Sequence, residues 1–158
     1  MLALTPWLVL FHILAALWLA GGAFAGAVVR AQTRKAPDLA SRVQGMRIGN
    51  RLMQVFALPG GITVGILGIA LVVPRGIGFQ QGWVHASIGL WLLMLGNGVL
   101  YLRPWMQKAL AEAEASLATG GPTDELKRLT AMKGPRIAAD LNALGIVVLT
   151  ALMVLKPF

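Results

Sequence analysis

Two histidines, His12 and His85, are the side chains whose type and placement best support chemistry in this sequence. Each lies near the start of a long apolar stretch, His12 in residues 7–29 and His85 in residues 83–102. A neutral imidazole is a common ligand of haem iron and of other metals. An ionisable residue inside an apolar span indicates a functional site by default. The question is therefore which elements would bring the two histidines together.

The composition indicates a membrane protein. Of 158 residues, 57% are hydrophobic and 13% are charged, whereas about a quarter of a soluble domain is charged. The chain has no cysteine, which excludes disulfides, thiolate metal sites and cysteine-linked haem. The first apolar stretch lacks a basic leader and a small-residue cleavage motif, so we expect it to be retained as a span. Motifs of serine hydrolases and zinc proteases are absent from the sequence.

Four apolar segments predict an all-α, four-helix transmembrane bundle in a single integral membrane domain, residues 1–158. Their ranges are 7–29, 52–73, 83–102 and 136–155. About 20 apolar residues in a helix cross the hydrocarbon core. Pro59 within the second segment predicts a kink, because proline removes a backbone donor. Residues 104–119 and a segment starting at Thr123 predict short cytoplasmic helical extensions.

The basic residues predict the orientation of the bundle. The formal net charge is +8, and twelve of the 14 Lys and Arg residues fall in, or at the boundary of, the connections between spans one and two and between spans three and four. The other two are Arg75 and Lys156. Positive charge favours the cytoplasmic side, so both long connections should be cytoplasmic and both termini outside. Because the charges flank apolar spans, we expect no nucleic-acid partner.

This topology places both histidines in the outer part of the bilayer. His12 lies about 7–8 Å and His85 about 3 Å below the outer ends of their helices. The hypothesis is that they are the axial ligands of one haem b held between spans one and three. Gly89, one turn from His85, would leave room for the macrocycle, and Arg75 could pair with a haem propionate. The alternative is that each histidine only hydrogen-bonds a backbone carbonyl or a lipid headgroup.

A second polar group lies at the opposite, cytoplasmic end of the spans. Asp140 is the only acid in a predicted span. A carboxylate at this depth is expected to pair with Arg51 or with Arg136, which would fix the register of the helices. The alternative is that Asp140 takes part in handling protons or a quinone.

The apolar segments also resemble a known family. FHILAALWLAGG (11–22), RLMQVFALPGGITVGILGIALV (51–72), GFQQGWVHASIGLW (78–91) and RIAADLNALGIVVLTALMVLKP (136–157) resemble small bacterial integral membrane proteins with no assigned function. FHI and GWVH are similar, more distantly, to membrane-bound protoporphyrinogen oxidases, which implies haem binding by His12 and His85. That group has a lysine where this chain has Ser87. Copper-resistance membrane domains share a comparable helix pattern.

Three classes of function follow. The first is a b-type cytochrome-like protein with a redox or tetrapyrrole-related role, which as an enzyme would be a haem-dependent oxidoreductase. The second is a non-catalytic accessory subunit of a larger membrane complex or homo-oligomer, and a non-enzymatic role is favoured. The third is a small transporter or metal-handling protein. In each case the expected location is the bacterial inner membrane, with the lipid bilayer as the constant partner.

Overall fold

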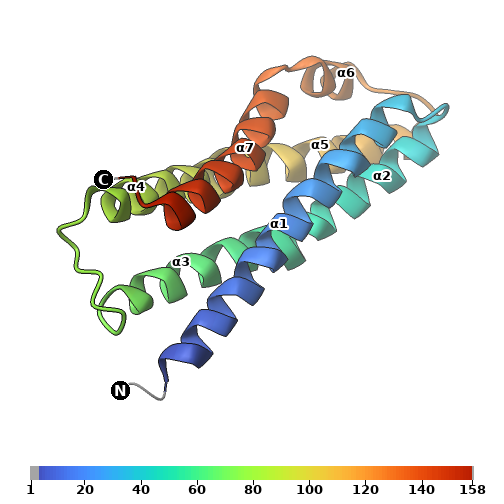
Figure 1. The fold of residues 1–158 in the computed structure, drawn as a ribbon. Coiled ribbons are helices and arrows are strands. Elements are labelled where there is room, and N and C mark those ends of the chain that lie inside the picture. The colour runs from blue at the N-terminus through green and yellow to red at the C-terminus, as the bar shows by residue number, and fades with distance from the viewer. Residues whose placement is uncertain (1–3, 158) are drawn as a thin grey trace.

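The computed structural model describes residues 4–157, which form four long helical rods and one short helix (Figure 1). The first rod is α1 (Thr5–Lys35). The second runs through α2 (Leu39–Leu52), η1 (Met53–Ala57) and α3 (Leu58–Val72), and the third through α4 (Gly82–Gly96), η2 (Asn97–Leu102) and α5 (Arg103–Ala118). The short α6 (Asp124–Ala131) leads into α7 (Gly134–Leu155). These described residues contain no β-strand, and four helical stretches are long and apolar enough to cross a membrane, which confirms the predicted fold class.

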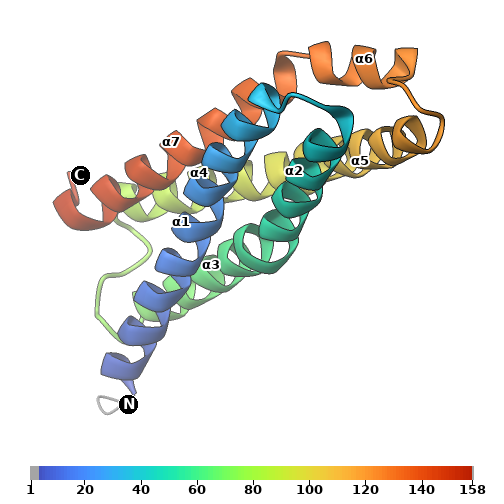
Figure 2. The same ribbon diagram turned by 90° about the vertical axis from the view of Figure 1, so that its right-hand side faces the viewer.

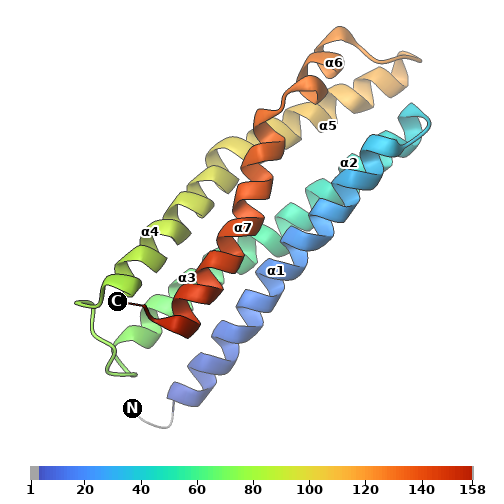
Figure 3. The same ribbon diagram turned by 45° about the horizontal axis from the view of Figure 1, so that its top comes forward.

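The rods have two chemically different ends. The start of α1, the end of α7 and the 73–81 loop lie together at one end, which we call the terminal end (Figure 1). The α1–α2 connection and α6 lie at the other, which we call the basic end (Figure 3). This is the arrangement that four sequential spans require. Which end faces the cytoplasm stays a prediction from the distribution of Lys and Arg.

The second and third rods each continue through a proline, because a π-helical turn precedes that proline. Pro59 is the second residue of α3 and Pro104 the second of α5. Just before them, the Leu58 N–H donates to the Met53 carbonyl and the Arg103 N–H to the Gly98 carbonyl, both five residues back. A widened turn of this kind accommodates the missing donor and the bulk of the proline ring. Pro59 thus lies just after the π-helical turn η1, and the kink expected there stays a prediction.

The helices extend beyond the predicted spans at the basic end. The predicted extension at 104–119 is α5, and the segment after Thr123 is α6. Thr123 caps α6 by accepting a hydrogen bond from the Leu126 N–H at 3.2 Å, and Asp38 caps α2 by accepting from the Ser41 N–H at 2.8 Å. Such caps satisfy backbone donors that a helix start leaves free.

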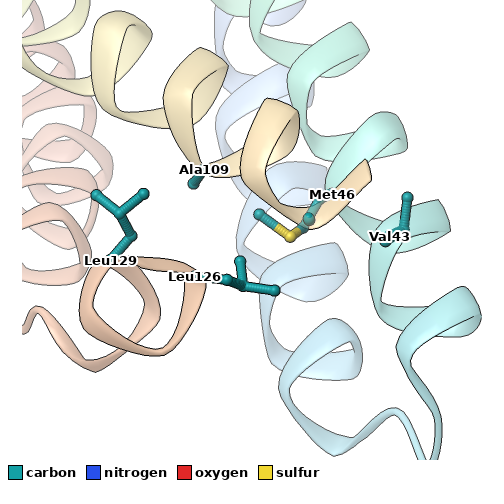
Figure 4. Close-up of a cluster of buried hydrophobic side chains, with 6 residues drawn as sticks. Val43, Met46, Ala109, Leu126 and Leu129 are labelled. Atoms are coloured by element: carbon teal, nitrogen blue, oxygen red, sulfur yellow. The ribbon is translucent and has the colours of Figure 1, made fainter. Parts of the chain in front are cut away.

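The best-packed core lies at the basic end, between α2, α5 and α6 rather than within the apolar spans (Figure 4). It consists of Val43, Met46, Ala109, Ala113, Leu126 and Leu129. Ion pairs between Arg47 and Glu114, 2.8 Å, and between Lys108 and Glu125, 2.7 Å, lie across the same three helices. This compact unit holds the basic ends of the second and third rods together.

The spanning part consists of two helix pairs. In one pair α1 packs closely on α3 and η1, and in the other α4 packs on α7 (Figure 2). Close approach in the first pair depends on glycine, because a Cβ atom on Gly22 would lie 2.5 Å from the Cβ of Phe56. Contacts between the pairs, from α1 to α7 and from α3 to α4, are fewer than those within each pair. Outward-facing leucines such as Leu93 and Leu100 are 73% and 79% exposed, as expected for residues that face lipid.

Candidate functional site

His12 lies on the face of α1 that packs against α3. Its Cε1 atom is 3.1 Å from the position that a Cβ atom would take on Gly68, so the absence of a side chain there makes room for the ring. The Nδ1 atom of His12 is buried and has no hydrogen-bond partner among residues 4–157. A buried polar atom without a partner is costly in an apolar setting.

His85 lies on the outward face of α4. Its side chain is exposed, and its Nδ1 atom is 3.3 Å from the Gln81 carbonyl oxygen, one turn earlier. Gly89 shares this face, and no heavy atom lies within 4 Å of the position of its missing Cβ. The inward face of the same helix carries Val84 and Ser87, both buried.

The structure does not bring the two histidines together. The substantial contacts of α1 are with α2, η1, α3 and α7, and those of α4 are with α3, η2 and α7. Arg75 is exposed in the 73–81 loop, at the same end as both histidines. A haem held by His12 and His85 would require α4 to turn His85 toward α1, so that ligand pair stays a prediction.

A central cavity lies between the two helix pairs, and all four rods contribute to it. It has a volume of about 130 Å³ and is mostly apolar. Its wall includes Leu19, Gly22, Gly26, Ala57, Gly61, Met94, Leu95, Ala139 and Ile146. A dry apolar cavity of comparable size can hold a molecule such as benzene. Glycine and alanine on several facing helices leave this space open.

A second, larger cavity adjoins the first at the basic end. This basic chamber has a volume of about 400 Å³ and shares Arg30, Gly49, Trp105, Met106 and Pro135 with the wall of the central cavity. Five cationic side chains line it, and no Asp or Glu does. They are Arg30, Arg34, Arg42, Lys133 and Arg136. We call the two adjoining cavities together the cleft, which is apolar at the central cavity and lined by cations at the basic chamber.

Polar contacts of α7 fix this helix beside the cleft. The Asn97 Nδ2 donates to Asn142 Oδ1 at 2.8 Å and to the Ala138 carbonyl at 2.9 Å. Asp140 Oδ1 is 3.5 Å from Arg30 Nη2, and its Oδ2 is 3.8 Å from Arg136 Nε. The predicted pairing with Arg136 is confirmed, and the alternative pairing with Arg51 is wrong. Arg30, instead of Arg51, pairs with Asp140, because α1 rather than α2 packs against α7.

These features define the class of the protein. Four apolar helices, an outward surface rich in exposed leucine and two helix pairs around an apolar cleft are those of a multi-pass integral membrane protein. The chain belongs to the family described as "Predicted integral membrane protein (DUF2269)", which matches residues 6–157. No curated protein and no solved structure gives a significant match to the chain. The expected membership of a family of integral membrane proteins is confirmed, whereas the resemblance to protoporphyrinogen oxidases stays a prediction.

Sequence reasoning did not identify the residues of the cleft. Arg34, Arg42 and Lys133 lie far apart in the chain, and the positive-inside rule accounts for each of them without any binding role. Trp105 lies just after the third predicted span, where a tryptophan is expected at the membrane interface without any binding role. The one local signal in the sequence is the density of Gly and Ala in the first predicted span, which indicates close helix packing but not a cavity.

Proposed function

We propose that this protein is a non-catalytic membrane protein that holds the hydrocarbon part of a lipid-like molecule between its two helix pairs. The observation that carries the proposal is the central cavity, which is apolar and receives residues from all four rods. An apolar pocket with few polar groups is the usual form of a site for a hydrophobic ligand.

The dimensions of the cleft support a hydrocarbon chain. Along α1 the cavity wall runs from Leu19 to Arg30, and along α7 from Pro135 to Ile146. Eleven residues of helix rise about 16 Å. One leaflet contributes half of a hydrocarbon core that is about 30 Å thick. The lining residues thus extend over about the depth of one leaflet, and a volume of about 130 Å³ accommodates a segment of a hydrocarbon chain. The side between α1 and α7, where the helices make fewer contacts, is where the chain would enter.

The test is whether a hydrophobic molecule stays with the purified full-length protein. Ala139 lines the central cavity, whereas Ala151 lies on the exposed surface of the same helix. Native mass spectrometry after extensive detergent washing should show one retained lipid-like molecule on the wild-type protein and on Ala151→Phe. Ala139→Phe should lose most of it, because the ring fills the cavity. Equal retention by both variants, or none by the wild type, would contradict the proposal.

Haem b binding is a second candidate, and the unpartnered Nδ1 of His12 is the observation that favours it. The residues described here do not present His85 as a facing ligand, so the proposal predicts a helix rearrangement on binding. An absorption spectrum of protein expressed with ample haem tests it. A Soret band that is lost in both His12→Ala and His85→Ala would support the ligand pair, and a featureless spectrum would overturn it.

A role as an accessory subunit of a larger complex or as a homo-oligomer is compatible with lipid binding. The open space around Gly89 and Gly96 on α4 would let a further helix approach closely. Leucine at both positions should then abolish co-purification of a partner in mild detergent without changing lipid retention. We place the protein in the bacterial cytoplasmic membrane, with the basic end inside.

A further inference from the structure

The charge of the basic chamber is not explained by ion pairs within the protein. Among its five cations, Arg30 and Arg136 both approach the single carboxylate of Asp140. Arg34, Arg42 and Lys133 take part in no ion pair within residues 4–157. They come from α1, from α2 and from the connection before α7, so three separate elements direct positive charge to one place.

A second observation is an unpaired hydrogen-bond donor on a residue of the chamber wall. The Nε1 atom of Trp105 is buried, and no acceptor in the described part of the chain is bonded to it. Trp105 lies in the wall shared by the central cavity and the basic chamber. In contrast, the Nε1 of Trp91, which also lines the central cavity, donates to the Gly61 carbonyl at 2.7 Å. Buried indole N–H groups usually find a partner, and this one has none among the described residues, so a ligand oxygen could satisfy it once the side chains that cover it move.

The chamber lies at the depth of a lipid headgroup. The uncharged part of α1 ends at Val29, and Arg30 follows at the boundary between the two cavities. Farther along α1, toward the basic end, Thr33 and Arg34 line the basic chamber. Hydrocarbon on one side and concentrated positive charge on the other match an amphiphile with an apolar tail and an anionic head.

We propose that the basic chamber binds the phosphate headgroup of an anionic phospholipid of the surrounding membrane, whose tail occupies the central cavity. The proposal rests on the proposed function and adds the chemistry of the head to it. Arginine suits this task because its planar fork donates two parallel hydrogen bonds to a phosphate. Basic pockets between spanning helices are known to take anionic lipid heads.

The test is a lipid titration of the full-length protein in detergent, followed by native mass spectrometry. The probes are phosphatidylglycerol and phosphatidylcholine with identical acyl chains, and inorganic phosphate as competitor. The chamber variant is Arg34→Gln with Arg42→Gln. The matched control is Arg51→Gln with Arg103→Gln, which removes two exposed arginines of the same end that do not line the chamber. Far-ultraviolet circular dichroism establishes that both variants are folded.

The proposal expects wild type and control to prefer phosphatidylglycerol over phosphatidylcholine by roughly tenfold or more, and the chamber variant to lose that preference. Equal binding of both lipids by the wild type would overturn the headgroup inference while leaving the tail in the cavity. Equal loss of preference in both variants would show a general surface attraction and would also overturn it. Displacement by inorganic phosphate alone would identify a free anion as the ligand instead. Binding of neither lipid would overturn the proposed function itself.

Discussion

Gly60 is the position at which a single methyl group should most sharply test the packing of α1 on α3. A Cβ atom added there would lie 2.7 Å from the backbone nitrogen of Leu19 and 3.0 Å from its Cα. Ordinary contact begins near 3.4 Å, so Gly60→Ala requires the two helices to separate by about 0.7 Å. A gap of 0.5–1 Å forfeits a quarter to a half of the dispersion attraction of each affected contact.

The expected cost is about 1–3 kcal/mol in the free energy of unfolding, the usual range for overpacking. Gly21→Ala is the matched control, because no heavy atom lies within 4 Å of its Cβ position. Both substitutions replace a helical glycine by alanine, so the gain in helix propensity cancels in the comparison. Reversible unfolding of the purified protein in mixed detergent micelles, followed by circular dichroism, would measure the difference. Equal stability of the two variants would refute the close approach of α1 and α3.

Three further predictions concern the contacts of α7, the cap of α2 and the orientation. Asn97→Ala removes two hydrogen bonds that Asn97 donates to α7. It should destabilise the protein by about 1 kcal/mol in the same assay, since interhelical hydrogen bonds in membranes average about 0.6 kcal/mol each. An unchanged stability would argue against the contact between Asn97 and α7. Hydrogen bonds from the Ser41 N–H and hydroxyl lower the pKa of Asp38 below its ordinary value of 3.8. The cap is therefore fully present above pH 3.8 and is lost as the pH falls through the lowered pKa. Amide protection at the start of α2 should be greater in the wild type than in Asp38→Ala near neutral pH, and the two proteins should converge in acid. A difference that persists in strong acid would contradict this. A cysteine at Gln80 should react with an impermeant thiol reagent added from outside, and one at Thr119 should not; the reverse pattern would invert the orientation.

The sequence was sufficient to predict the helices, because their apolar length is a direct consequence of the bilayer thickness. The span ranges 7–29 and 136–155 fall within α1 and α7, and the predicted extension at 104–119 is α5. The predicted helix start at Thr123 is confirmed, and the Thr123 hydroxyl caps α6 by accepting a hydrogen bond from the Leu126 N–H. Sequence patterns thus predict helix lengths and helix caps, because both depend on residues that are close together in the chain.

The relative rotation of the helices could not be predicted in this way. An apolar helix in a bilayer has little amphipathic signal, so nothing in residues 83–102 distinguishes the outward face of His85 from the inward face of Ser87. The Asp140 partner was uncertain for the same reason, because Arg30 and Arg51 both flank spans that could lie beside α7. A cavity formed by residues of four helices requires all of these rotations at once, and sequence patterns supply none of them.

The absence of cysteine from the sequence allows the central claim to be tested directly. Ala139→Cys places a small thiol in the wall of the central cavity, and Ala151→Cys places one on the exposed surface of the same helix. In washed protein that retains its lipid, mass spectrometry should find the thiol of Ala139→Cys protected from N-ethylmaleimide, and delipidation should make it reactive, whereas the thiol of Ala151→Cys should react in both samples. Equal reactivity of Ala139→Cys before and after delipidation would contradict a lipid chain held between the two helix pairs.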